Sequence, residues 1–148
     1  MNGSHYNGEW LGDMRHGHGT FKTKEGLCYV GAFQNDQRHG QGVITYPNDT
    51  ELRGVWDHDV RKGKARILWY NGNVYDGELV GQNMHGHGTY TWKSGATYHG
   101  KFSNGMKHGQ GVMQYADQKV YTGNWKNDVR SGKGEMRWPN GDHFDGDW

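Results

Sequence analysis

The sequence predicts an all-β fold, a single-layer antiparallel meander of 23-residue β-hairpin repeats that forms an elongated twisted sheet or trough. Three observations predict it: a strict internal repeat, an alternation of period two within each repeat, and turn dipeptides at fixed places. Of 148 residues, 26 are Gly, seven are Trp and nine are Tyr. Such a high aromatic content argues against disorder. Only 32% of residues are hydrophobic, so we expect a thin architecture with little conventional core.

The repeat is defined by a large residue that recurs every 23 positions without insertion. These residues are Tyr6, Tyr29, Leu52, Tyr75, Tyr98, Tyr121 and Phe144. Gly follows two positions later in every repeat, and a second large apolar residue follows two further on. The second set is Trp10, Phe33, Trp56, Leu79, Phe102, Trp125 and Trp148. The chain is therefore one array, 1–148, with repeats 6–28, 29–51, 52–74, 75–97, 98–120 and 121–143 and a partial seventh, 144–148.

Each repeat has the pattern of a β-hairpin. In the fourth, Tyr75 and Leu79 share one face of a first strand, and Gly81-Gln82 is a turn signal that recurs as Asn35-Asp36, Asn104-Gly105 and Asn127-Asp128. A second strand is predicted over 88–92, ending at the turn Ser94-Gly95. Consecutive hairpins are expected to pair edge to edge, because a lone hairpin cannot bury its apolar face.

The two faces of the predicted sheet differ. One carries the aromatic columns, and we expect the rings to lie across the recurrent glycines, so that a single layer buries enough area. The opposite face is mostly polar. Its residues include Thr20, Lys22, Arg53, Arg66, Lys101, Glu135 and Arg137.

The repeat resembles a known family. The pattern Tyr-x-Gly-x-Trp at 6–10, followed by His-Gly-x-Gly at 16–19, resembles the membrane occupation and recognition nexus (MORN) repeat, and the resemblance covers essentially the whole chain. It implies a non-enzymatic interaction module that binds proteins, dimerises in some members, and binds phosphoinositides in some accounts. Departures from the pattern are Leu52, Lys62 and Ala65 in the third repeat and Ser131 in the sixth.

The main functional hypothesis is a non-catalytic scaffold that assembles or self-associates through its aromatic surface and strand edges. Phe144 and Trp148 belong to a strand without its hairpin partner, so we expect an open edge there and a longer natural protein. The candidate interaction or structural aromatics are Tyr6, Trp10, Tyr29, Phe33, Trp56, Tyr75, Tyr98, Phe102, Tyr121 and Trp125.

A row of basic residues supports an alternative. Arg15, Arg38, Arg61, Lys107 and Arg130 occupy one repeat position, where Met84 is the exception. Such a ladder would bind anionic lipids or phosphoinositides at a membrane surface. It would equally be a solvated edge whose charges balance Asp13, Asp36, Asp59 and Asp128 in the same turns. A third possibility is a regulatory array within a larger enzyme, such as a phosphatidylinositol phosphate kinase.

Other chemistry has little support. The pairs His16/His18 and His85/His87 have spacing suited to zinc, but no Cys or carboxylate cluster completes a four-ligand site. We therefore predict no catalytic, cofactor-binding or metal-binding residues. A net charge of +1 disfavours nucleic acid as a partner. The single cysteine, Cys28, and the absence of a long apolar stretch favour a cytoplasmic protein, either peripheral to a membrane or associated with the cytoskeleton.

Overall fold

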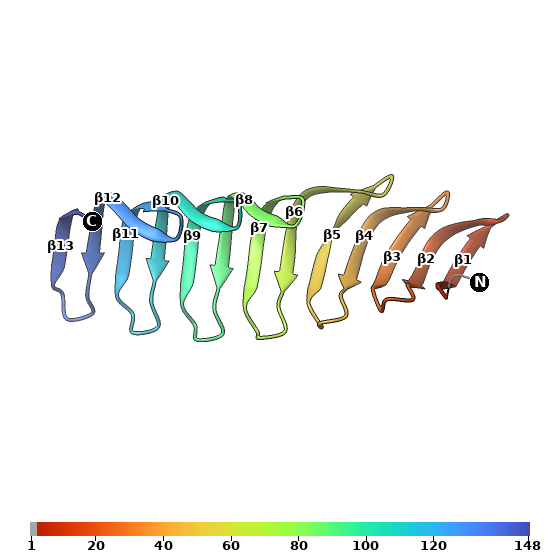
Figure 1. The fold of residues 1–148 in the computed structure, drawn as a ribbon, viewed down its shortest axis with the longest axis horizontal. Coiled ribbons are helices and arrows are strands. Elements are labelled where there is room, and N and C mark those ends of the chain that lie inside the picture. The colour runs from red at the N-terminus through yellow and green to blue at the C-terminus, as the bar shows by residue number, and fades with distance from the viewer. Residues whose placement is uncertain (1–2) are drawn as a thin grey trace. The chain divides into compact units, whose positions relative to one another are not determined.

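The computed structural model describes residues 3–148 and contains two compact units, one ending at Tyr70 and the other beginning at Asn71 (Figure 1). All regular structure in this range is β-strand, and it holds no helix of a length and apolarity able to cross a membrane. Unit 1 contains β1 (His5–Leu11), β2 (Met14–Lys22), β3 (Cys28–Gln34), β4 (Gln37–Thr45), β5 (Glu51–Asp57) and β6 (Val60–Leu68). Unit 2 contains β7 (Val74–Val80), β8 (Asn83–Thr91), β9 (Thr97–Ser103), β10 (Met106–Gln114), β11 (Val120–Lys126), β12 (Val129–Arg137) and β13 (His143–Asp147).

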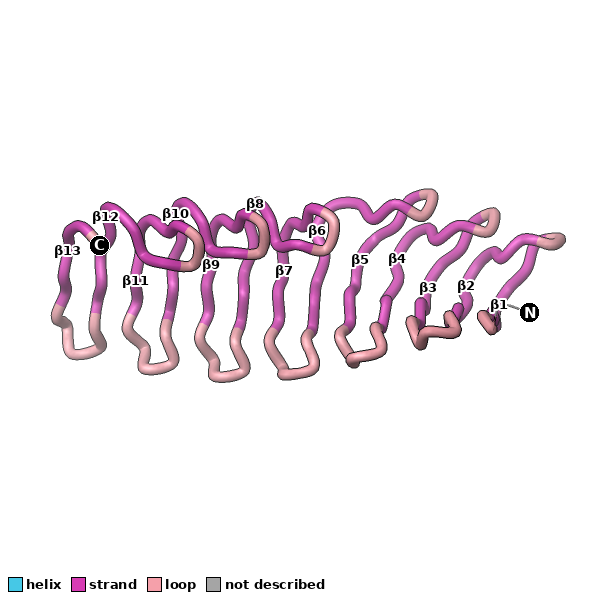
Figure 2. Tube along the Cα trace, viewed as in Figure 1, coloured by secondary structure: helices cyan, strands magenta, loops and turns pink. Residues whose placement is uncertain are grey.

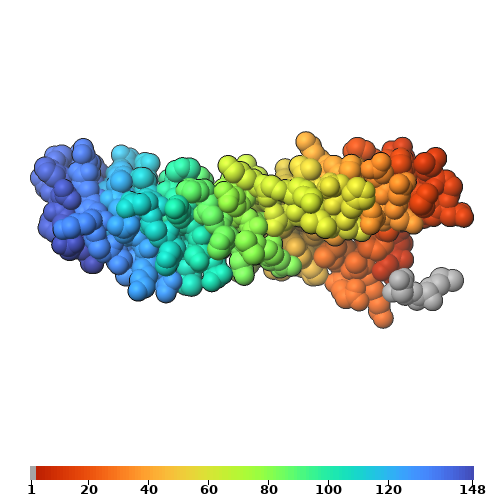
Figure 3. Space-filling view, turned by 90° about the horizontal axis from the view of Figure 1, so that it is seen from above, coloured from red at the N-terminus to blue at the C-terminus, as the bar shows by residue number. Residues whose placement is uncertain are grey.

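Within each unit, every strand pairs antiparallel with the next strand along the chain. The predicted class, an all-β antiparallel meander of hairpin repeats, is confirmed. In the space-filling view, the repeats of unit 2 follow one another in chain order, from green to blue (Figure 3). One boundary prediction was wrong: β8 begins at Asn83, directly after the turn, whereas the sequence predicted a strand over 88–92.

The two-residue turns have the backbone twist that favours tight hairpins. Asn35 and Asp36 both have positive φ, 49° and 68°, as a type I′ turn requires. In the Gly12-Asp13 turn only the first residue has positive φ, at 60°, which is the type II′ pattern. Asn, Asp and Gly tolerate this region best, so the turn residues read from the sequence are physically the right ones.

Each hairpin bends near its two-residue turn (Figure 2). In β1–β2 the pairing register shifts between Gly8 and Trp10, and Gly17 on the opposing strand has φ 63°. The extra residues form a bulge, which bends a strand and increases its twist. The same shift recurs in the later hairpins of both units. The second strand therefore continues through the His-Gly segment, which explains why β8 starts earlier than the alternation pattern suggested.

The core consists of tyrosine rings laid on glycine backbone. Tyr29, Tyr75, Tyr98 and Tyr121 are the largest fully buried side chains. A side-chain carbon added to Gly42 would overlap the ring of Tyr29, and one added to Gly31 would lie 2.7 Å from its Oη. The Tyr29 hydroxyl donates a hydrogen bond to the Ala32 carbonyl at 2.9 Å. The expected cover of aromatic rings over glycine is therefore confirmed.

The rings also contact one another edge to face. Tyr29 meets Phe33 of its own repeat at 5.1 Å between centroids and Trp56 of the next repeat at 5.4 Å. This arrangement suits the quadrupoles of aromatic rings. Comparable contacts link Trp10, Tyr6 and Phe33 in unit 1, and Tyr75, Phe102, Tyr98, Trp125, Tyr121, Trp148 and Phe144 in unit 2.

This network decides the role of most aromatics singled out in the sequence. Phe33, Trp56, Phe102 and Trp125 are buried, as are the four tyrosines above, so these side chains are structural and offer no exposed binding surface. Trp10 differs, because it lies on the first strand of unit 1 and is 56% exposed.

The third repeat lacks the contact between a tyrosine ring and glycine backbone, and two of its residues have changed together. Leu52 takes the place of the tyrosine, and Ala65 takes the place of the glycine that the ring would cover; both are buried. Gly54 consequently has room that the glycines at the same position of the other repeats lack. A carbon added to Gly54 would lie 3.4 Å from Arg61 Cδ, which is an ordinary contact. Without a ring, the backbone here no longer needs to be bare.

Gly42 and Gly54 face each other across β4 and β5, so they form a matched pair for mutation. We expect Gly42→Ala to lower the free energy of unfolding by about 1–3 kcal/mol, because the methyl group displaces the Tyr29 ring. Gly54→Ala should leave it unchanged or raise it by up to about 1 kcal/mol, since Ala restricts the unfolded chain. Urea denaturation followed by circular dichroism measures both. Equal destabilisation by the two changes would contradict the proposed packing.

Burial raises the pKa of Tyr29, Tyr75 and Tyr98 to about 12, from an ordinary value of 10.0. Since the folded-state pKa is the higher one, this stabilisation is complete below pH 10 and is lost as the pH rises towards about 12. We therefore expect unfolding to accompany ionisation of these tyrosines in that window. Tyrosinate absorbance recorded together with circular dichroism tests this, and the difference between the wild type and Tyr98→Phe isolates Tyr98. Ionisation of Tyr98 near pH 10 with the fold intact would refute the expectation.

Candidate functional site

We call the face of each unit that carries the tyrosine rings its inner face. A pocket opens on this face in each unit. The unit 1 pocket, of about 280 Å³, is lined by Arg15, Phe21, Leu27, Tyr29, Phe33, Asp36, Arg38 and Asp59. The unit 2 pocket, of about 320 Å³, is lined by Met84, Tyr90, Trp92, Phe102, Gly105, Lys107 and Asp128. Most lining residues of the two pockets occupy the same repeat positions, so the pocket is a product of the repeat itself.

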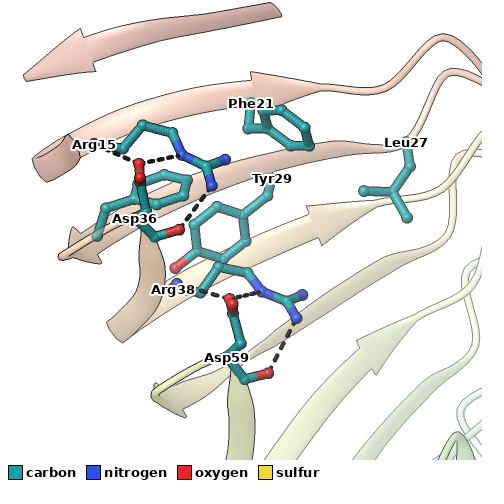
Figure 4. Close-up of a pocket in the computed structure, with 8 residues that line it drawn as sticks. Arg15, Phe21, Leu27, Tyr29, Asp36, Arg38 and Asp59 are labelled. Carbon is teal, nitrogen blue, oxygen red and sulfur yellow. Dashed lines mark hydrogen bonds and ion pairs between the residues drawn. The ribbon is translucent and has the colours of Figure 1, made fainter. Parts of the chain in front are cut away.

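Two ion pairs, Arg15–Asp36 and Arg38–Asp59, form one wall of the unit 1 pocket (Figure 4). Asp36 lies in the turn of the second hairpin and reaches back to Arg15 of the first. Its Oδ1 accepts hydrogen bonds from the Arg15 backbone N–H at 2.7 Å and from Nε at 3.2 Å. Arg38 and Asp59 repeat this arrangement one hairpin later, at 2.8 and 3.1 Å. The backbone hydrogen bond from Arg15, followed by its guanidinium, lowers the pKa of Asp36.

The bend in each hairpin brings these partners together. It places the turn of one hairpin against the second strand of the hairpin before it, so that the Asp36 N–H donates to the Arg15 carbonyl at 3.0 Å. The guanidinium of Arg15 then lies over the inner face, 5.1 Å from the Phe21 ring centroid and 5.2 Å from that of Phe33. Each such cation is held by a carboxylate and by aromatic rings together.

The unit 2 pocket lacks one of these ion pairs. Met84 occupies the repeat position of Arg15, and Gly105 occupies that of Asp36; the Gly105 N–H still donates to the Met84 carbonyl at 2.9 Å. The backbone contact is thus kept without the charges. Lys107 remains paired with Asp128, at 3.4 Å. The unit 2 pocket is therefore lined by two charged residues, whereas the unit 1 pocket is lined by four.

Two of the three aromatic side chains that line the unit 2 pocket are partly exposed, while the third, Phe102, is buried. Tyr90 and Trp92 are half-buried, and their rings are tilted against each other with centroids 4.5 Å apart. The Lys107 ammonium lies 5.4 Å from the Trp92 ring centroid. This pocket therefore combines partly exposed aromatic surface with one cation.

The basic row predicted from sequence lies along the inner face. Arg15, Arg38 and Lys107 are each paired with an aspartate from the next turn. Arg130 lies over the Trp148 ring at 4.1 Å, and Arg61 donates to the Gly63 carbonyl at 3.3 Å. Three of the five cations are thus balanced by aspartates. Each partner comes from the next turn, whereas the solvated-edge alternative supposed that it comes from the same turn.

Sequence reasoning missed the pocket residues Phe21, Leu27, Met84, Tyr90 and Trp92 as functional candidates. A signal was present, because the alternation of the second strand placed Tyr90 and Trp92 on the aromatic face. What the pattern lacked was any sign that they remain accessible while the recurrent tyrosines are covered.

Within each unit, hairpins of one length, each paired to the next, define a repeat protein in which every repeat contacts its neighbours. Family comparison agrees with this class. Six segments match the MORN repeat: 6–27, 29–51, 53–74, 75–97, 98–120 and 121–143. They span most of the sequence, so the chain belongs to the MORN repeat family. Among curated proteins, none matches it.

Two solved structures are similar to this chain. The TCP domain of Drosophila melanogaster SAS-4 (dCPAP), in complex with a proline-rich motif of Ana2 (dSTIL), is 14% identical over 87% of this chain and 71% of its own, with a TM-score of 0.58. The TCP10 domain of Danio rerio CPAP, in complex with a STIL peptide, is 17% identical over 88% of this chain and 68% of its own, with a TM-score of 0.44. The Drosophila domain therefore shares the fold of this chain.

Proposed function

We propose that this chain is a protein-interaction scaffold whose unit 2 pocket binds an extended segment of a partner protein. The observation that carries the proposal is the pairing of half-buried Tyr90 and Trp92 in the unit 2 pocket, beside the buried Phe102. Trp and Tyr are the residue types that contribute most to protein-binding hot spots, especially in a concave setting.

The pocket is already organised for binding. The Asn73 amide donates to the Tyr90 hydroxyl at 2.9 Å, while its Oδ1 accepts from the Lys93 N–H at 3.0 Å. The loop that carries Trp92 is closed by a hydrogen bond from the Trp92 N–H to the Ala96 carbonyl at 2.9 Å. A site held in this way loses little conformational entropy when a ligand binds.

The preferred ligand is an extended, proline-containing segment with few acidic residues. Aromatic-lined grooves dock polyproline II segments, because the segment is already ordered and its rings pack on aromatic faces. Lys107 is paired with Asp128, so there is no uncompensated positive charge to attract an acidic ligand. Support by analogy comes from the Drosophila TCP domain, which shares the fold and is described in complex with a proline-rich motif.

Lipid binding through the basic row is a weaker proposal. A cation that already has a carboxylate partner attracts an anionic headgroup less, and three of the five are paired. A cytoplasmic or cytoskeletal location, self-association through strand edges, and attachment to a larger enzyme also stay proposals. Sequencing the full-length transcript tests the last of these.

Replacing Trp92 tests the peptide site. A display library of short proline-containing peptides, selected on the wild-type chain, supplies the probe, and isothermal titration measures its Kd. Trp92→Ala should weaken binding by at least about tenfold, as loss of a hot-spot side chain does. Val112→Ala is the control, because Val112 is 39% exposed on the opposite face, and it should leave the Kd unchanged. Equal binding by wild type and Trp92→Ala, with both folded by circular dichroism, would refute the site.

Vesicle sedimentation tests the lipid alternative with phosphatidylserine and phosphoinositide vesicles at about 0.15 M salt. We expect little wild-type binding. The triple change of Asp36, Asp59 and Asp128 to Asn should increase it, because three cations lose their carboxylate partners. Strong wild-type binding that is abolished when Arg15, Arg38, Arg61, Lys107 and Arg130 are all replaced by Gln would instead establish the basic row as a lipid site.

A further inference from the structure

Three potential metal ligands converge in unit 1, away from the inner-face pocket. His39 lies on β4, Asp57 is the last residue of β5, and His58 is the first residue of the turn that follows. One donor atom from each side chain lies within 4.8 Å of the other two. All three side chains are partly exposed, so an ion has a path to the cluster from solvent.

The backbone produces this convergence. Gly40 pairs with Trp56 in the β4–β5 ladder, which places His39 and Asp57 one step further along the same register. His58 follows directly, with φ 49°, as the first residue of a type I′ turn. The cluster is therefore fixed by a strand pair and a tight turn, which are the rigid parts of the repeat.

The donor spacing suits a small divalent ion. Asp57 Oδ1 lies 3.5 Å from His39 Nδ1 and 2.6 Å from His58 Nδ1. A tetrahedral zinc ion at about 2.0–2.1 Å from each donor would hold those donors about 3.3 Å apart. The 3.5 Å separation is close to this value, the 2.6 Å separation is shorter, and the third is no more than 4.8 Å. Both His39 Nδ1 and His16 Nδ1 are shielded from solvent without a hydrogen-bond partner, so what distinguishes His39 is the carboxylate and the second imidazole beside it.

The charged residues beside the cluster pair with each other and do not occupy its donor atoms. Asp59 follows His58 in the chain. Its carboxylate forms an ion pair with Arg38 at 3.1 Å and so neutralises that cation. Asp57 has no Lys or Arg ion pair among the contacts within residues 3–148. Its carboxylate faces the two imidazoles alone.

The other repeats show that the fold does not require this cluster. The family histidine His39 corresponds to His16, His85 and His108. The positions that correspond to Asp57-His58 are occupied there by Gln34-Asn35, Ser103-Asn104 and Lys126-Asn127. The complete triad occurs at one place, so it is a property of this chain rather than of the repeat.

We propose that His39, Asp57 and His58 bind a divalent transition-metal ion, best matched by Zn²⁺. Two imidazoles and a carboxylate are a ligand set that zinc accepts, and three protein ligands leave a coordination position for water. The bound ion would link β4 to the turn after β5. This proposal differs from the sequence prediction of no metal-binding residues, which weighed the pairs His16/His18 and His85/His87.

Zinc titration of the tag-free chain tests the proposal, with a fluorescent zinc indicator as competitor. We expect one site per chain and at least about a tenfold loss of affinity in His39→Gln and in His58→Asn, because two ligands cannot replace three. His16→Gln is the matched control, since His16 holds the same repeat position without the carboxylate and second imidazole. It should bind zinc like the wild type. Equal affinity in all four proteins, or an equal loss in His16→Gln, would overturn the site.

A second measurement covers variants that fail to fold. In the wild-type chain, zinc should shift the imidazole NMR resonances of His39 and His58 at one equivalent and leave those of His16 and His108 unchanged. Shifts spread evenly over the histidines would mean weak general binding and would overturn the proposal. Co²⁺ substitution gives an independent signature, since tetrahedral coordination produces a visible absorption band that should vanish in Asp57→Asn.

Discussion

The contact between a tyrosine ring and bare glycine backbone is the interaction on which the rest of the structure depends. A single-layer sheet has no second layer to cover its apolar face, so burial must come from side chains that lie flat along the sheet. Tyr29 does this over Gly42, with its hydroxyl satisfied by the Ala32 carbonyl. The third repeat supports the same constraint. Leu52 has no ring to lie on the backbone, and the position that is glycine in the other repeats is Ala65 there.

The bend of the hairpins connects this core to the candidate site. A bulge with glycine in the left-handed region turns the end of each hairpin, and the turn then bonds to the strand before it. One backbone contact therefore brings Asp36 to Arg15 and, equally, Gly105 to Met84. Where the side chains are charged, they form the wall of the pocket. Where they are not, the uncharged Met84 and Gly105 line the pocket beside Tyr90 and Trp92.

Repetition separates the positions that build the scaffold from those that give this chain its own chemistry. Scaffold positions vary little, because each ring must cover the glycines of its own repeat and contact the next ring. Individual chemistry is found where one repeat departs from the others. The unit 2 pocket departs at Met84 and Gly105, and the proposed metal site departs at Asp57-His58. In both places the backbone is the common one, so a small number of substitutions adds a binding property at little cost to the fold.

The sequence by itself determined the repeat length, the hairpin turns and the covering of glycine by rings, since these follow from local period and from backbone conformations that only certain residues adopt. It also identified the repeat position that the basic residues share, with Met84 as the exception. Only the tertiary structure decided what these residues do. The bulge bends each hairpin by an amount that no pattern of polarity encodes, and that bend pairs Arg15 with Asp36 rather than exposing it. Likewise, His39 and Asp57 are far apart in sequence, and their donor atoms meet because the β4–β5 register places them side by side.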